Sequence, residues 1–81
     1  MARVSGQSDT DDLLPALGRA IREARKACGL SQEALADAAG IDRSHMGKIE
    51  RGERNVTILN VARIAAALDA KPSELLRDAG L

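Results

Sequence analysis

Apolar residues recur at three- and four-residue spacing along most of the chain, with polar residues between them. This is the pattern of amphipathic helices. It predicts an all-α domain of five short helices over residues 12–81. Residues 1–11 are mostly small, polar and unpatterned, so we expect them to form a flexible N-terminal arm.

The stretch 29–53 predicts two short helices joined by a tight turn. Ser31 can cap the first helix because its hydroxyl accepts backbone N–H bonds. Gly40 can end that helix in the left-handed conformation, which glycine adopts without Cβ strain. Asp42 can cap the second helix, which we expect to end near residue 51. Two such helices with a glycine in the turn form a helix-turn-helix.

The second helix of this pair has two different sides when its residues are placed about 100° apart around the axis. Met46, Ile49 and Glu50 fall on a side that can pack on a core. The opposite side is cationic and polar except for one glycine, and comprises Arg43, Ser44, Gly47, Lys48 and Arg51. Such a helix fits the major groove of DNA, where Arg and Lys can bond guanine O6 and N7.

Gly47 is costly inside a helix, by about 1 kcal/mol relative to alanine. Two interpretations stand at this point. The missing side chain lets a duplex approach closely, or Gly47 occupies a surface position where the cost is tolerated.

The flanking helices carry apolar stripes of their own. The first is expected to begin near residues 13–15 and to end at Gly29, with a buried stripe of Leu14, Leu17, Ile21, Ala24 and Cys28. The next follows the cap Thr57 over residues 57–70, with a core stripe of Ile58, Val61, Ile64, Ala65 and Leu68. The last helix begins at Pro72.

The helix over 57–70 has a wider apolar arc than the roughly 100° that a one-sided surface helix needs. The excess predicts a two-fold homodimer through this helix and the last one, with an interface of Leu59, Ala62, Ala66, Leu75 and Leu76. The alternative is a thick monomer core in which the last helix covers Leu59. In a dimer, two recognition helices would meet major grooves about 34 Å apart, so the operator would be a palindrome.

Composition narrows the function classes. The 81 residues carry 12 basic and 12 acidic side chains, so a strongly basic, indiscriminate nucleic-acid binder is not expected. The chain has no Phe, Tyr or Trp, and therefore lacks the stacking platforms of single-strand binders. The single cysteine fits a reducing cytoplasm. No apolar run suits a membrane span or a signal peptide.

An enzyme is not expected, because the one histidine and the one cysteine have no partners for a catalytic triad, metal cluster or phosphate loop. His45 flanks the two sides of its helix and is interpreted as a boundary residue. We therefore expect no cofactor, no metal and no small-molecule ligand.

Five sequence motifs carry a family resemblance, namely residues 29–36 (GLSQEALA), 40–44 (GIDRS), Met46, 48–52 (KIERG) and 65–68 (AAAL). With them, the chain from about Leu17 to Leu76 resembles the lambda-repressor-like, Cro/C1-type (XRE) helix-turn-helix regulators. The segment 49–60 (IERGERNVTILN) is most similar to controller proteins of restriction–modification systems. The resemblance implies a compact five-helix DNA-binding domain.

The resemblance also implies roles for particular residues. Arg43, Ser44 and Lys48 match positions that read base edges, which predicts at least one G·C pair in each half-site. Gln32 and Arg51 match positions that contact phosphates. Arg25 and Glu50 match a structural ion pair between the first helix and the recognition helix. The alternative is that both are surface charges.

The residues before the fourth helix offer a second phosphate contact, because a helix N-terminus presents free N–H groups. Arg54, Asn55 and Thr57 are the candidates, and the first two suit an ordinary turn equally well. The expected partners are a double-stranded DNA operator, a second copy of the chain and, as a further candidate, RNA polymerase. The alternative function is a protein-interaction or antitoxin-type module on the same fold.

Overall fold

A computed structural model describes the chain from residue 7 onward, with side chains from residue 12. It contains five helices over this range, α1 (Gln7–Ala27), α2 (Gln32–Ala39), α3 (Arg43–Glu50), α4 (Ile58–Ala67) and α5 (Pro72–Asp78). This is the all-α architecture that the sequence predicts. None of these helices is long and apolar enough to cross a membrane.

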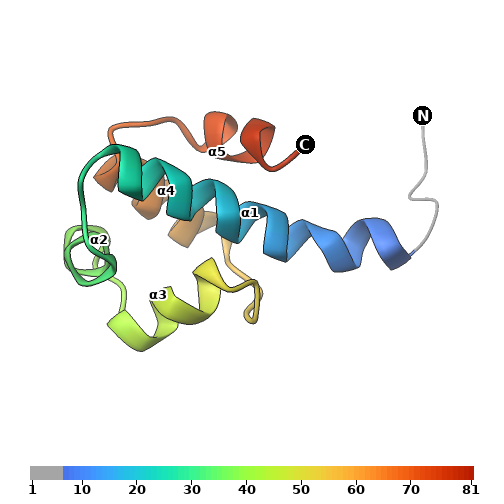
Figure 1. The fold of residues 1–81 in the computed structure, drawn as a ribbon, viewed down its shortest axis with the longest axis horizontal. Coiled ribbons are helices and arrows are strands. Elements are labelled where there is room, and N and C mark those ends of the chain that lie inside the picture. The colour runs from blue at the N-terminus through green and yellow to red at the C-terminus, as the bar shows by residue number, and fades with distance from the viewer. Residues whose placement is uncertain (1–6) are drawn as a thin grey trace.

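α1 runs along the 38 Å length of the molecule (Figure 1). α3 contacts α1 from one side and α5 contacts it from the other (Figure 1). α4 packs against both α2 and α5. The N-terminal turns of α1 extend beyond the other helices (Figure 1).

Local signals set the predicted helix ends. Ser31 Oγ accepts the Ala34 N–H at 3.0 Å and begins α2. Gly40, at a φ of 70°, ends it in the left-handed conformation. The Asp42 carboxylate accepts the backbone N–H groups of the first turn of α3. Each of these caps satisfies backbone groups that have no partner within the helix.

The core is aliphatic and draws on every helix and on the turn after α2. Its thirteen buried members are Leu17, Ile21, Leu35, Ala36, Ala39, Ile41, Met46, Ile49, Val61, Ile64, Ala65, Leu68 and Leu75. Leucine, isoleucine and alanine fill the space between closely packed helices without any aromatic ring.

The start of α1 differs from the prediction. The helix begins at Gln7 rather than near residues 13–15, so Pro15 lies inside it. Of the expected arm, residues 1–6 lie outside the described residues, and residues 7–11 are helical. Pro15 contacts the turn after α3 closely, because a Cβ built on Gly52 would lie 2.6 Å from Pro15 Cα.

Four burial predictions were wrong. Leu14 is only half-buried and is not among the apolar residues that pack against the core. Cys28 is exposed one residue beyond the end of α1, although its Sγ donates to the Leu68 carbonyl at 3.7 Å. Ile58 is 71% exposed although it has the spacing of the buried stripe of α4. Leu75 is 1% exposed and belongs to the core. Helical spacing assigns a residue to one side of a helix, whereas burial depends on whether another element covers that position.

Candidate DNA interface

The inner side of α3 is anchored in the domain. Met46 and Ile49 are buried in the core, as the sequence predicts. Glu50 is buried beside them and forms a bidentate ion pair with Arg25 of α1. Arg25 Nε donates to Glu50 Oε2 at 2.7 Å, and Arg25 Nη2 donates to Glu50 Oε1 at 3.0 Å. The predicted pairing is therefore present, with only 11% and 3% of the two side chains exposed.

Two further hydrogen bonds extend this pair into a network. Arg25 Nη1 donates to the Leu30 carbonyl at 3.0 Å, and Gln32 Nε2 donates to Glu50 Oε1 at 3.1 Å. No buried side-chain nitrogen or oxygen among residues 12–81 lacks a partner. The network joins α1, the turn before α2, α2 and α3, so it holds the orientation of α3.

Gly18 lets α1 approach the end of α3 closely, a contact that the sequence pattern did not predict. A Cβ on Gly18 would lie 2.4 Å from the Glu50 carbonyl oxygen and 2.6 Å from that of Ile49. Both atoms are backbone and cannot turn aside. The available signal was the glycine itself, because a glycine inside a helical pattern costs stability and usually has a packing reason.

Gly47 has a role that neither of its two interpretations foresaw. It is buried rather than open to a duplex. A Cβ there would lie 3.2 Å from both Gln32 Oε1 and Arg51 Nη1. The side chains of Gln32 and Arg51 therefore occupy the space that we expected DNA to enter.

The outer side of α3 presents the predicted base-reading residues to solvent. Arg43 and Ser44 are exposed and Lys48 is half-buried. The Ser44 hydroxyl donates to the Asp42 carboxylate. This bond, with those from the His45 and Ser44 N–H groups, holds the pKa of Asp42 below its usual range.

The segment after α3 is polar and exposed. Arg51, Arg54 and Asn55 project into solvent. Arg51 pairs with Glu53 at 3.0 Å, and this hydrogen bond lowers the pKa of the Glu53 carboxyl. Thr57 Oγ1 caps α4 by accepting the Asn60 N–H at 3.1 Å.

The predicted dimer surface is present only in part. Leu59 is 56% exposed, and Ala62 and Ala66 are exposed on α4. Leu76 is half-buried against the core. Leu75 does not belong to the predicted dimer surface, because α5 packs it into the core. α5 does not cover Leu59, so the alternative of a thick monomer core was wrong at this residue.

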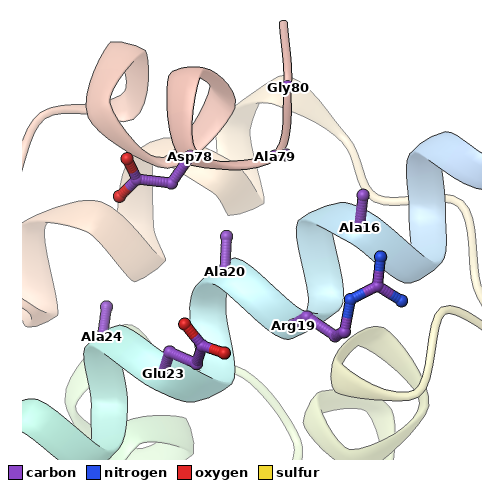
Figure 2. Close-up of a pocket in the computed structure, with 8 residues that line it drawn as sticks. All are labelled: Ala16, Arg19, Ala20, Glu23, Ala24, Asp78, Ala79 and Gly80. Atoms are coloured by element: carbon purple, nitrogen blue, oxygen red, sulfur yellow. The ribbon is translucent and has the colours of Figure 1, made fainter.

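A groove of about 480 Å³ lies between α1 and the end of α5 (Figure 2). Its wall is formed by small residues with three charged side chains, namely Ala16, Arg19, Ala20, Glu23, Ala24, Asp78, Ala79 and Gly80. No group of three His, Cys, Asp or Glu side chains that could hold a metal ion occurs within the described chain.

A buried anchor on one side of α3, with exposed Arg43 and Ser44 and half-buried Lys48 on the other, is the arrangement expected of a helix-turn-helix DNA-binding protein. The helix-turn-helix family pattern matches residues 21–75, so the chain belongs to this family of DNA-binding transcription regulators. The match runs from the middle of α1 into α5 and contains the whole interface.

Individual relatives support the same class. The control protein C.SmaI of Serratia marcescens is 39% identical over 70 residues, covering 86% of this chain and 83% of the relative. The crystal structure of the restriction-modification controller protein C.AhdI from Aeromonas hydrophila is similar, with 52% identity and a TM-score of 0.75 over 76% of this chain and 94% of that one. The clp gene regulator ClgR from Corynebacterium glutamicum has 31% identity and a TM-score of 0.81, over 84% and 87% of the two chains.

Proposed function

We propose that this chain is a homodimeric transcription regulator that binds a palindromic operator, in the role of a restriction–modification controller. The observation that carries the proposal is the exposed outer side of α3 on a helix anchored from behind by the Arg25–Glu50 pair. The similarity to the control protein C.SmaI and the controller protein C.AhdI supports the controller role.

In this proposal the outer side of α3 reads bases. Arg43, Ser44 and Lys48 lie on a helix of eight residues whose exposed side has no apolar side chain. Arginine and lysine suit guanine, and a serine hydroxyl suits several base edges. Ser44 must share its hydroxyl with Asp42, so we assign it a smaller contribution than the two cations.

The phosphate contacts are proposed for residues on either side of α3. They are Gln32, Arg51, Arg54, Asn55 and Thr57. The side chains of Gln32 and Thr57 already make hydrogen bonds within the protein. For these two we propose that the contact runs through the first-turn backbone N–H groups of α2 and α4, which point toward an approaching anion.

The dimer is proposed through α4. Leu59, Ala62 and Ala66 are exposed and share one side of the helix, and an exposed apolar stripe on a small domain marks an interaction site. Leu76 lies at its proposed edge. We propose RNA polymerase as a further partner, since a regulator bound at a promoter lies beside it. A cytoplasmic location follows from the proposed DNA target.

Replacing Arg43 by alanine tests the base-reading assignment. A lost bidentate contact costs about 1–3 kcal/mol of discrimination, so operator affinity should fall while binding to random duplex changes less. Fluorescence anisotropy on both duplexes measures this. Arg77→Ala is the control, because Arg77 is an exposed, ion-paired arginine on α5. Equal losses in the two variants would contradict the assignment.

Replacing Leu59 by glutamate tests the dimer. A charge in an apolar interface should convert the dimer to a monomer. Size-exclusion chromatography with light-scattering detection measures the molecular mass. Leu81→Glu supplies a matched control, because Leu81 is also an exposed leucine but lies outside α4. If Leu59→Glu leaves the molecular mass unchanged, the α4 interface is wrong.

A folded dimer without sequence preference for DNA would favour the alternative function, a protein-interaction module.

A further inference from the structure

Two acidic side chains from the segments on either side of α3 pair with arginines at its two ends. Glu33, in the first turn of α2, lies 3.0 Å from Arg43 at the start of α3. Glu53, in the turn after α3, lies 3.0 Å from Arg51 at its end. Both arginines are candidates for DNA contact, so each end of the recognition helix holds its cation against a carboxylate in the free protein.

Stability does not account for these two pairs. The Arg43 and Glu33 side chains are 66% and 63% exposed. Exposed ion pairs contribute only about 0–1 kcal/mol to folding, because water and salt screen them and the side chains lose freedom. The same exposure makes the pairs easy to open, so the arginines can exchange a carboxylate for another acceptor.

DNA presents two kinds of acceptor, and the carboxylates affect them differently. Binding to random sequence rests almost entirely on phosphate contacts, so each carboxylate near the backbone repels DNA and competes for its arginine. On a matching base, an arginine gains paired hydrogen bonds to guanine O6 and N7. These base contacts can offset the loss of the pair, whereas a single phosphate contact replaces one anion by another.

We propose that Glu33 is a specificity-determining residue and that Glu53 lowers affinity for DNA of any sequence. By holding Arg43, a proposed base reader, Glu33 weakens binding to random DNA more than binding to the operator. Glu53 holds Arg51, a proposed phosphate contact, and therefore weakens both. The inference rests on the proposed function of the outer side of α3. It also gives a reason for the zero formal net charge of a DNA-binding chain, because acids placed beside the contact residues suppress indiscriminate binding.

The test compares Glu33→Gln and Glu53→Gln in the full chain, each on a random-sequence duplex by anisotropy at several salt concentrations. Glutamine keeps the size and can still accept a hydrogen bond from arginine. We expect each variant to bind random duplex about three- to fivefold more tightly at low salt. The salt dependence should steepen by about one phosphate contact, since the arginine becomes free to neutralise it.

Glu23→Gln is the matched control. Glu23 is exposed on α1 beside the α1–α5 groove (Figure 2), and its replacement makes the same change in net charge. If Glu23→Gln tightens random binding as much as Glu33→Gln, the effect is one of overall charge and the proposal is overturned. Unchanged random binding in both Glu33→Gln and Glu53→Gln also overturns it.

The operator duplex separates this inference from the proposed function. In the expected result, the ratio of operator to random affinity falls in Glu33→Gln but not in Glu53→Gln or Glu23→Gln. The operator is sought among duplexes from the region upstream of the chain's own gene. If the wild-type chain binds these duplexes and random duplex equally, the proposed function is contradicted. The comparison of variants on random duplex still decides the role of the two carboxylates in that case.

Discussion

The two sides of α3 each carry an arginine–glutamate ion pair of similar length, in opposite surroundings. On the inner side Arg25 and Glu50 are buried and meet at 2.7 Å. On the outer side Arg43 and Glu33 are exposed and meet at 3.0 Å. Breaking a buried pair strands a charge away from water, which is costly, whereas an exposed pair opens at little cost. The inner pair therefore fixes the helix, and the outer pair can be exchanged for a ligand.

Because of this difference, the inner side of α3 positions the helix and the outer side is available to contact DNA. The core, Gly18 and the Arg25–Glu50 network place the helix, so little ordering remains when DNA binds. The outer side chains stay free to change partner. Variants that act on one side only should therefore separate stability from DNA binding.

Glu50→Ala should have the largest effect on stability. It leaves Arg25 buried without its carboxylate and removes the acceptor of Gln32 Nε2. The expected loss is about 3–5 kcal/mol in the free energy of unfolding, measured with urea. The double variant Arg25→Met with Glu50→Leu should recover much of that loss, because an apolar pair requires no charge compensation. A loss below about 1 kcal/mol in Glu50→Ala, as for an exposed pair, would contradict the structural role of the inner pair.

Replacement of two helical glycines by alanine should have opposite effects on the stability of the fold. Gly18→Ala puts a methyl group against the backbone carbonyls of α3, so we expect destabilisation of about 1–3 kcal/mol. Gly47→Ala meets only the ends of the Gln32 and Arg51 side chains. These can move, and alanine favours the helix by about 1 kcal/mol, so stability should hold or rise. Thermal unfolding of both variants measures the contrast, and equal destabilisation would contradict it.

The smallest effect should come from Asp42 at low pH. Its pKa is lowered in the folded chain, first by the Ser44 hydroxyl and then by two backbone N–H groups. The stabilisation that the charged Asp42 cap gives the folded chain is therefore complete above the unfolded-state pKa of aspartate, about 4. It is lost as the pH falls through the lowered pKa of the folded state. Asp42→Asn keeps a good cap that does not titrate. Between about pH 5 and pH 3, the wild-type melting temperature should fall more than that of Asp42→Asn. Parallel decreases would exclude this contribution.

Sequence patterns predicted the start and end of α2 and the starts of α3 and α4, because caps act within one turn, whereas the start of α1 at Gln7 was not predicted. Ser31, Gly40, Asp42 and Thr57 each carry a side chain or backbone freedom suited to its position, and no distant contact is needed. The Arg25–Glu50 pair spans 25 positions, and only the family resemblance could connect them.

Other features depend on contacts that helical spacing does not contain. Leu75 and Ile58 both belong to apolar patterns, but α5 carries the first into the core while nothing in the described chain buries the second. Gly47 lies on the polar side of α3, yet Gln32 from the preceding helix reaches across it. Such placements follow from how the helices pack on one another, and one helix alone cannot reveal them.

We infer that the outer side of α3 reads a DNA sequence. The most direct test is an anisotropy titration of the wild-type chain with duplexes from the region upstream of its own gene, across several salt concentrations. We predict tight, competitor-resistant binding to one palindromic segment, with a steep salt dependence. Weak binding that is equal for that segment and for its scrambled sequence, by a chain shown to be folded and dimeric, would contradict the claim.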